Sequence, residues 1–267
     1  MTNHNYLATI VFIIIFVLSN SAFAQTNVYK GYDANPGPGP SLATNPNSTT
    51  AGNSFKSQLT GVSTEGFESF DTGTAAPLNL TFAGTAGTLL ATLNGPGLVQ
   101  SATRASPTGT GQYATAGIRY FEIDDAAFTI NFALPVAAFG YFGADLETPS
   151  RINITLNYAA GGSRVYNLET LFGYTAASYL PGTSFLPSGG IHFLGFIDNA
   201  NPFSSIVFNG AGAGGDIWAF DQMTIGESRQ ITSIVPELTT WAMMIGGLGA
   251  IGGSFRYRRR ARKVSFA

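Results

Sequence analysis

The chain has 267 residues, of which 45% are hydrophobic and 10% are charged, and its formal net charge at pH 7 is −2. Residues 25–235 contain seven basic and fourteen acidic residues, so this body has a net charge of −7 and lacks the basic surface of a nucleic-acid-binding protein. The chain has no cysteine, which excludes disulfides and thiolate metal sites.

The first 24 residues have the pattern of a secretory signal peptide. Residues 7–18 read LATIVFIIIFVL and carry no charge, and Ala22 and Ala24 supply the small-x-small pattern that signal peptidase accepts. We therefore expect export through the Sec translocon and cleavage after Ala24. The alternative is an uncleaved membrane anchor, but the apolar run has the length of a signal core and is short for a membrane span.

Residues 25–62 are predicted to form a Gly/Pro-rich lead-in to the folded body. Prolines alternate with glycine over residues 36–40, and the surrounding sequence has few apolar residues, which indicates an extended segment without regular structure. The stretch 47–50 (NSTT) is suited to cap a short helix that runs through Leu59. Phe55 and Leu59 are four residues apart and fall on one face of that helix.

Residues 63–228 show the short, alternating apolar runs of β-strands. On residues 126–134 the predicted inward side chains are Phe128, Ile130, Phe132 and Leu134, and residues 151–158 alternate in the same way. Ten strands are predicted, at 78–82, 87–93, 117–123, 126–134, 136–143, 151–158, 163–168, 190–197, 203–209 and 217–225. Because no long helices separate them, we expect an antiparallel all-β domain, a β-sandwich with jelly-roll-like topology.

Few residues in this body are suited to catalysis. His192 is its one histidine and lies in a strand-like run, so we expect it to be a structural residue of the core or of a sheet edge. Neither a Cys-His site nor a multi-histidine zinc site is available, and no nucleophile elbow accompanies His192. The glycine-rich stretch 210–215 lacks the Lys-Ser/Thr pair of a P-loop and is interpreted as a turn.

Carboxylates leave an enzymatic alternative open. Asp145 and Glu147 follow an aromatic strand, and a glycoside hydrolase needs two facing carboxyl groups. The Asp124-Asp125 pair is interpreted most simply as a solvated turn between two strands. A glycan-active hydrolase is therefore the alternative to a non-enzymatic body.

A calcium site is the one cofactor that the sequence suggests. Glu68 and Asp71 lie in the first strand region and Asp221 lies in the last, and the first and last strands of a jelly roll often lie side by side. Carboxylates and nearby carbonyl groups would supply the oxygen ligands that calcium prefers. Sugar-binding jelly rolls offer an analogy for a structural calcium there. The alternative is a plain exposed acid at each strand end.

The C-terminal segment combines an apolar run with a basic tail. Residues 241–255 would extend about 22 Å as a helix, against ~30 Å for a bilayer core, and residues 234–240 lengthen the run. We predict a transmembrane helix at about 239–256. The positive charges that follow it form a cytoplasmic topology stop, made by Arg256, Arg258, Arg259, Arg260, Arg262 and Lys263. A permanent single-span anchor is the competing interpretation. A basic nucleic-acid-binding arm is the other alternative, but it does not fit an exported body.

This C-terminus resembles a PEP-CTERM sorting signal, in the variant that carries Trp-Ala. The order is a Pro-Glu motif, a Trp-Ala pair, a Gly-rich apolar span and an arginine cluster. The motif residues are Val235, Pro236, Glu237, Trp241 and Ala242, and Leu238 stands where the family usually has a second proline. The resemblance implies that exosortase, an integral membrane enzyme of Gram-negative bacteria that make exopolysaccharide, reads and processes the tail.

The body also resembles, more loosely, the bodies of some such proteins. The shared features are an Asn-Ser-Thr stretch at 47–49, Phe67-Glu68 and the sequence FDQMTIG at 220–226. The resemblance implies no established activity for this body.

The sequence thus predicts an exported, non-enzymatic protein of the cell envelope or extracellular matrix. Its parts are a signal peptide at 1–24, a lead-in at 25–62, a β-sandwich at 63–228, and a linker, sorting motif, transmembrane helix and basic tail at 229–267. The inner membrane is its transient location, and exopolysaccharide is the candidate ligand. The alternatives are a secreted glycan-active hydrolase and a permanently membrane-anchored carbohydrate-binding module.

Overall fold

The structure is a computed structural model that describes residues 26–35, 41–124, 127–183, 185–210, 216–232 and 247–248, and for Asp124 its backbone alone. The described residues up to Ile231 belong to one compact unit, and Thr232 begins a second. The predicted signal peptide and most of the C-terminal segment therefore lie outside the described residues.

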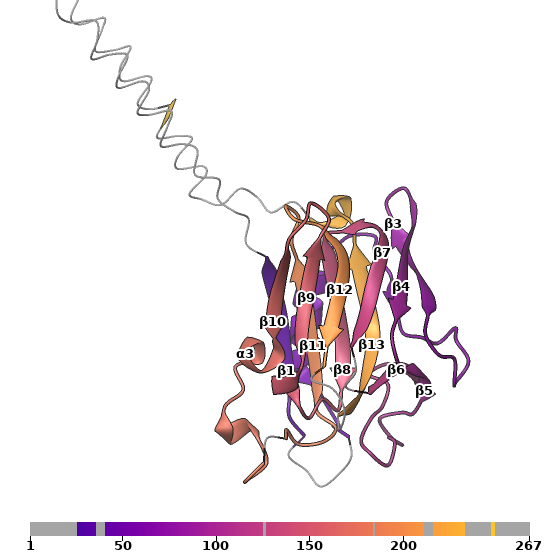
Figure 1. The fold of residues 1–267 in the computed structure, drawn as a ribbon, viewed down its shortest axis with the longest axis vertical. Helices are drawn as coiled ribbons and strands as arrows, with labels where there is room; N and C mark the ends of the chain where they lie inside the picture. Colours follow the sequence, from indigo (N-terminus) through magenta and orange to yellow (C-terminus); the bar gives the residue numbers. More distant parts are fainter. Residues whose placement is uncertain are drawn as a thin grey trace, which may run out of the picture. The chain divides into compact units, whose positions relative to one another are not determined.

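The compact unit consists of two antiparallel sheets packed face to face (Figure 1). The strands are β1 (Asn27–Asp33), β2 (Thr64–Glu65), β3 (Leu78–Gly84), β4 (Gly87–Asn94), β5 (Leu98–Ser101), β6 (Arg119–Asp124), β7 (Phe128–Val136), β8 (Ala138–Ala144), β9 (Asn153–Tyr158), β10 (Ser163–Asn167), β11 (Ile191–Ile197), β12 (Phe203–Asn209) and β13 (Ile217–Gly226). The helices are α2 (Pro46–Lys56) and α3 (Leu168–Phe172), with 3-10 turns at Pro149–Arg151, Ala176–Ser178 and Ser228–Gln230. All ten predicted strands are present, and the predicted antiparallel all-β sandwich is confirmed.

The order of strands in the two sheets follows the jelly-roll scheme. One sheet has the order β1-β11-β8-β13-β6-β5, with β2 paired to β13, and is called the helix-covered sheet below. The other has the order β10-β9-β12-β7-β4-β3 and is called the open sheet. From β6 to β13, successive strands alternate between the sheets except at the β9–β10 hairpin, so the two sheets interleave as in a jelly roll.

Alternating strands of the open sheet bury one face. Ile154 and Leu156 of β9 are buried in the core between the sheets, as the period-two pattern predicts. Leu134 departs from the prediction, since its side chain is 64% exposed. The pairing of β12 with β7 jumps from Val136 to Asn131 at this point, so Leu134 lies in a bulge that turns it to solvent.

The lead-in is an integral part of the sandwich. Residues 27–33 form β1, a strand that the sequence pattern did not predict, and it pairs with β11 along its whole length. The predicted helix is present as α2, and Phe55 and Leu59 are buried as expected. Asp33 at the end of β1 accepts hydrogen bonds from the first turn of α2, at 3.0 Å from Asn47 N and 2.8 Å from Ser48 N.

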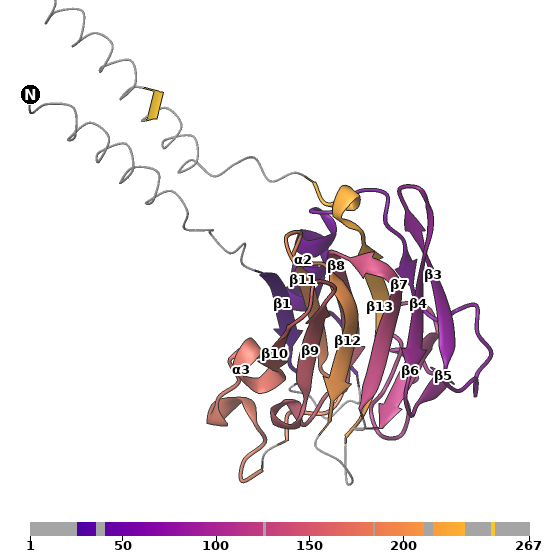
Figure 2. The same ribbon diagram turned by 45° about the horizontal axis from the view of Figure 1, so that its top comes forward.

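Helix α2 creates a second core on the outer face of one sheet. It packs on β1, β8 and β11 (Figure 2). The Phe55 ring enters this second core and contacts Tyr29 and Phe193, with ring centroids 5.7 and 5.6 Å away. Strands β8 and β11 are consequently buried on both faces. The glycines at 140 and 195 make room for the helix, because a Cβ there would lie 2.9 and 2.7 Å from the Phe55 ring.

Candidate functional site

The segments that hold the predicted calcium ligands do lie side by side, since β2 pairs with β13. Asp221 is fully buried, and its oxygens accept hydrogen bonds from protein donors. Its Oδ2 lies 2.8 Å from Thr115 N, 2.7 Å from Thr115 Oγ1 and 3.1 Å from Ala116 N, and its Oδ1 lies 2.6 Å from Gln222 N. Burial raises the pKa of Asp221 to about 7. This carboxyl group therefore anchors the loop that precedes β6.

The other two predicted ligands contact the end of the same loop and the start of β6. Glu68 Oε1 accepts hydrogen bonds from Ile118 N and Arg119 N, at 2.8 and 2.9 Å. Asp71 is exposed, and its Oδ1 lies 3.9 Å from Arg119 Nη1. The described residues contain no cluster of three His, Cys, Asp or Glu side chains arranged to hold a metal ion. Calcium binding by Glu68, Asp71 and Asp221 would compete with these hydrogen bonds, and it stays a prediction.

His192 is a core residue, as its place in a strand predicts. It is buried between the sheets, and the rings of Tyr141, Phe172 and Trp218 surround it at centroid distances of 5.4, 5.8 and 5.9 Å. Its Nε2 lies 3.3 Å from the Tyr141 hydroxyl group. Burial lowers the pKa of His192 to about 3, so the imidazole is neutral at physiological pH.

Carboxyl groups meet at the end of the sandwich where β8 ends and β13 begins. Asp145 is buried and accepts hydrogen bonds from Gln112 Nε2 at 2.7 Å, Ser188 Oγ at 3.0 Å and Gly189 N at 2.6 Å. Burial, followed by the nearby charge of Glu147, raises its pKa to about 7. Asp145 thus ties together two loops and a strand end.

Asp216 is a member of this cluster that the sequence analysis did not single out. Its Oδ2 accepts hydrogen bonds from the backbone amides of Glu147 and Thr148. Burial again raises its pKa to about 7. Of the Asp124-Asp125 pair, Asp124 ends β6 and Asp125 lies outside the described residues. Asp145 and Asp216 thus hold loops in place and are both removed from solvent.

Two pockets flank α2, and helical periodicity explains why they do. Residues spaced i, i+3, i+4 and i+7 share one stripe of a helix. The buried stripe of α2 contains Ser48, Ala51, Gly52 and Phe55. The neighbouring stripes line the pockets, one with Asn47, Thr50, Ala51 and Ser54, and the other with Thr49, Gly52, Asn53 and Lys56. The hydroxyl and amide side chains of α2 therefore face the two pockets.

The smaller pocket, called the polar pocket below, has a volume of about 200 Å³. It is lined by Asn45, Thr49, Gly52, Asn53, Lys56, Thr115, Phe142 and Gln222. The Phe142 ring reaches it because residue 52 is glycine, where a Cβ would lie 2.7 Å from Phe142 Cζ. Burial lowers the pKa of Lys56, while the charge of Asp221 opposes that shift. The pocket thus combines amides, hydroxyl groups, an aromatic ring and one cation.

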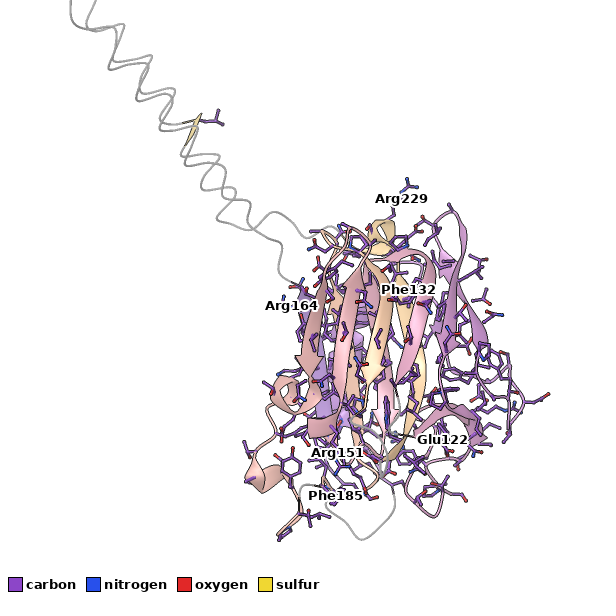
Figure 3. The ribbon with its side chains drawn as sticks, viewed as in Figure 1. Glu122, Phe132, Arg151, Arg164, Phe185 and Arg229 are labelled. Carbon is purple, nitrogen blue, oxygen red and sulfur yellow. The ribbon has the colours of Figure 1, made fainter. Side chains whose placement is uncertain are left out.

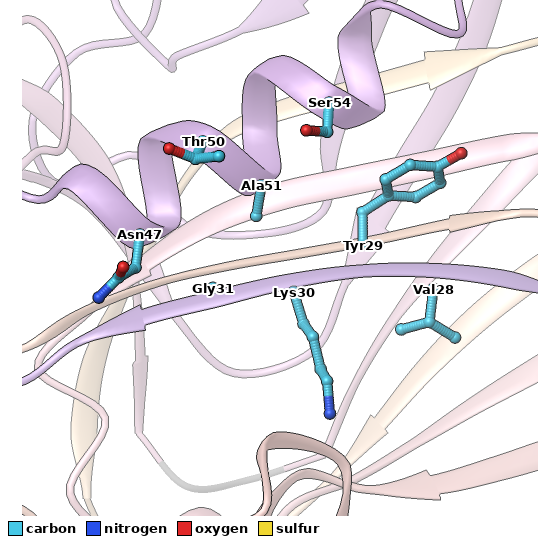
Figure 4. A pocket seen from close by; sticks show the side chains of 8 residues that line it. All are labelled: Val28, Tyr29, Lys30, Gly31, Asn47, Thr50, Ala51 and Ser54. Atoms are coloured by element: carbon cyan, nitrogen blue, oxygen red, sulfur yellow. The ribbon is translucent and has the colours of Figure 1, made fainter.

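The larger pocket, called the β1 groove below, lies between α2 and the edge strand β1 and has a volume of about 420 Å³ (Figure 4). Figure 4 shows Tyr29 directed toward the helix side and Lys30 directed to the opposite side of β1. The Lys30 ammonium group donates a hydrogen bond to the Leu171 carbonyl group. Tyr29, Asn47, Thr50 and Ser54 consequently give this groove its polar groups.

Three arginine side chains outside α2 do not gather at one site. Figure 3 shows Arg151, Arg164 and Arg229 well apart from one another. The polar pocket brings Lys56 together with hydrogen-bonding groups, whereas Lys30, which lines the β1 groove, already donates a hydrogen bond to the Leu171 carbonyl group. This arrangement was not predicted, although the polar residues at helical spacing over 47–56 are a visible signal in the sequence.

The sorting-motif residues at 235–242 and the predicted topology stop at 256–263 lie outside the described residues. The predicted transmembrane segment also lies outside them, apart from Gly247 and Leu248. No helix among the described residues has the length and apolarity needed to cross a membrane.

Comparisons with known proteins identify no family for this chain. No protein-family model matches the chain, and no curated protein matches it. Among solved structures, the chain is similar to the K2 cleaved adhesin domain of Lys-gingipain. The two share 14% sequence identity with a TM-score of 0.34, over 61% of this chain and 97% of that one. A likeness of this degree carries no argument about function.

Proposed function

We propose that this protein is an exported, non-enzymatic component of the cell envelope or extracellular matrix that binds exopolysaccharide. Its signal peptide at 1–24 directs it through the Sec translocon to signal peptidase. Its C-terminal helix at about 239–256 holds it in the inner membrane until exosortase processes the tail. The protein then reaches the envelope surface or the medium.

The sorting part of the proposal rests on one observation about order. The Pro-Glu motif, the Trp-Ala pair, the apolar span and the arginine cluster follow one another within the last 33 residues. Such a basic cluster after a short span retains that end in the cytoplasm. The sequence from Val235 to Lys263 therefore supports a sorting signal that a membrane enzyme recognises.

The binding part of the proposal rests on the two pockets beside α2. Sugar hydroxyl groups both donate and accept hydrogen bonds, and amide and hydroxyl side chains do the same. Such groups line both the polar pocket and the β1 groove. The burial of His192 and the structural hydrogen bonds of Asp145 and Asp216 favour binding over hydrolysis.

The test of binding uses the released protein, purified from its host, and the host's exopolysaccharide. We expect the protein to sediment with the polymer and to release no new reducing ends. Release of reducing ends would favour the glycan-active hydrolase, and failure to sediment would overturn the binding proposal.

The test of sorting uses the substitutions Pro236→Ala and Glu237→Gln together in the host. We expect this variant to stay in the inner membrane while the unchanged protein leaves it. Equal release of both proteins would contradict sorting through this motif.

A further inference from the structure

Lys56 brings an ammonium group to the polar pocket. It is half-buried at the last turn of α2, and no hydrogen bond or ion pair joins it to any described residue. Asp221 is the nearby acid, but its oxygens already accept four hydrogen bonds from Thr115, Ala116 and Gln222. A half-buried cation in this setting is best stabilised by an anion that enters the polar pocket from outside.

Gln222 is brought into the same pocket by an irregular strand. The pairing of β13 with β8 shifts register between Asp221 and Thr224, and Gln222 has a φ of 48°. A non-glycine residue in this left-handed region is uncommon and is held there by its surroundings. Its Nε2 donates to Thr115 Oγ1 at 2.9 Å, whereas its Oε1 has no partner within the described chain. The bulge thus presents an oriented acceptor to the pocket.

The rest of the pocket suits a single sugar ring. The Asn53 amide and the Thr49 hydroxyl group line one wall, both on α2, and the Phe142 ring supplies an apolar surface. The Asn45 amide is fixed by Arg104, whose Nη2 lies 2.9 Å from Asn45 Oδ1. A volume of about 200 Å³ holds one ring with its substituents rather than a length of polymer.

We propose that the polar pocket binds a carboxylate-bearing sugar ring, that is, a uronic acid residue of a polysaccharide. The Lys56 ammonium group pairs with the carboxylate, Gln222 Oε1 accepts a hydrogen bond from a ring hydroxyl group, and Phe142 packs against the ring. This inference rests on the proposed polysaccharide binding and adds the class of sugar that the site recognises. A neutral sugar would leave the Lys56 ammonium group desolvated and unpaired.

The experiment compares the host's exopolysaccharide with the same polymer after chemical reduction of its carboxyl groups to alcohols. The full-length gene is expressed in the host, and the protein that the host releases is purified. Biolayer interferometry measures its affinity for each polymer. We expect carboxyl reduction to weaken binding by about tenfold or more, the effect of losing one charge-assisted hydrogen bond.

Variants of Lys56 test whether the carboxylate binds at the polar pocket. Lys56→Gln should bind the native polymer about tenfold more weakly, as the reduced polymer does, and Lys56→Arg should retain most of the affinity. Arg164→Gln is the matched control, because it removes one positive charge from the edge strand β10 of the open sheet and should change nothing (Figure 3). The melting temperature of each variant verifies that it is folded.

The outcomes separate this inference from the proposed function. Binding of native and reduced polymer with equal affinity, or equal affinity of Lys56→Gln and the unchanged protein, would overturn the uronate site and leave polysaccharide binding standing. Absence of binding to the native polymer by the unchanged protein would overturn the proposed function itself.

Discussion

The central strands β8 and β11 of the helix-covered sheet are buried on both faces, whereas the strands of the open sheet bury one. Strands β8 (AFGYFGA) and β11 (IHFLGFI) of the helix-covered sheet are apolar apart from Tyr141 and His192, and they carry glycines where the aromatic rings of the second core approach. Strand β9 (NITLNY) of the open sheet alternates polar and apolar residues. In this protein, strands with few polar residues therefore belong to the sheet that α2 covers. The packing of α2 on that sheet also forms both pockets.

Buried acids divide between the sheets in the same way. Among the described residues, the buried carboxyl groups are those of Asp33, Asp145, Asp198, Asp216 and Asp221. Each lies in, or next to, a strand of the helix-covered sheet. The open sheet is thus held by apolar packing, and the helix-covered sheet also depends on buried hydrogen-bonded carboxyl groups.

Truncation of Phe55, the ring that fixes α2 to its sheet, should have the largest effect on stability. Phe55→Ala removes a fully buried ring from the second core, and we expect the free energy of unfolding to fall by about 3–5 kcal/mol. Leu90→Ala on the open sheet is the control, since that side chain is 52% exposed and its loss should cost less than about 0.5 kcal/mol. Urea denaturation measures both. Similar losses in the two variants would contradict the difference between the sheets.

Adding a methyl group at residue 31 should disrupt the packing of β1 against α2. A Cβ there would lie 2.2 Å from the Asn47 carbonyl oxygen, which is backbone and has little freedom to move. We expect Gly31→Ala to destabilise the fold by about 1–3 kcal/mol. Gly109→Ala, where a Cβ meets nothing within 4 Å, should be close to neutral. Hydrogen exchange would localise the damage to residues 27–33 and 46–56, and uniform exchange changes would count against this account.

Stability should fall as the pH rises from about 4 to about 7. The pKa values of Asp145, Asp216 and Asp221 are each raised to about 7, so the folded protein keeps protons that the unfolded chain releases above about pH 4. This contribution is complete below pH 4 and is lost above pH 7. His192 acts in the opposite direction, because its pKa is lowered to about 3, but it is one group against three.

Urea titrations at four pH values between 4.5 and 7.5 measure this slope. Asp145→Asn should flatten it, because one of the three titrating groups is gone. A free energy of unfolding that rises through this range would show that these carboxyl groups are ionised in the folded protein.

Calcium should have the smallest effect on this protein. Because the oxygens of Asp221 and Glu68 accept backbone hydrogen bonds, we expect millimolar calcium to raise the melting temperature by less than about 1 °C, which is under ~0.5 kcal/mol. A larger rise that EDTA reverses and that Asp221→Asn abolishes would establish the calcium site that the sequence suggests.

Local patterns could be predicted from the sequence, and contacts between distant segments could not. The ten strands follow from alternation or from apolar runs bounded by turn residues. Strand β1 (NVYKGYD) was missed because it is an edge strand with polar residues on both faces, and its neighbour β11 lies more than 150 residues away. The polar pocket is lined by residues of α2 together with Phe142 of β8 and Gln222 of β13, and no local pattern reveals that these segments meet. Asp216 was missed for the same reason, since only the fold brings it close to Asp145.

The most direct test of the central claim, export followed by removal of the C-terminal helix, is the intact mass of the protein recovered from each fraction of its host. We predict that the outer-surface or extracellular fraction contains a species that lacks residues 1–24 and everything beyond about Pro236. A species that retains the arginine tail and stays in the inner membrane would contradict sorting and would identify a permanent single-span anchor.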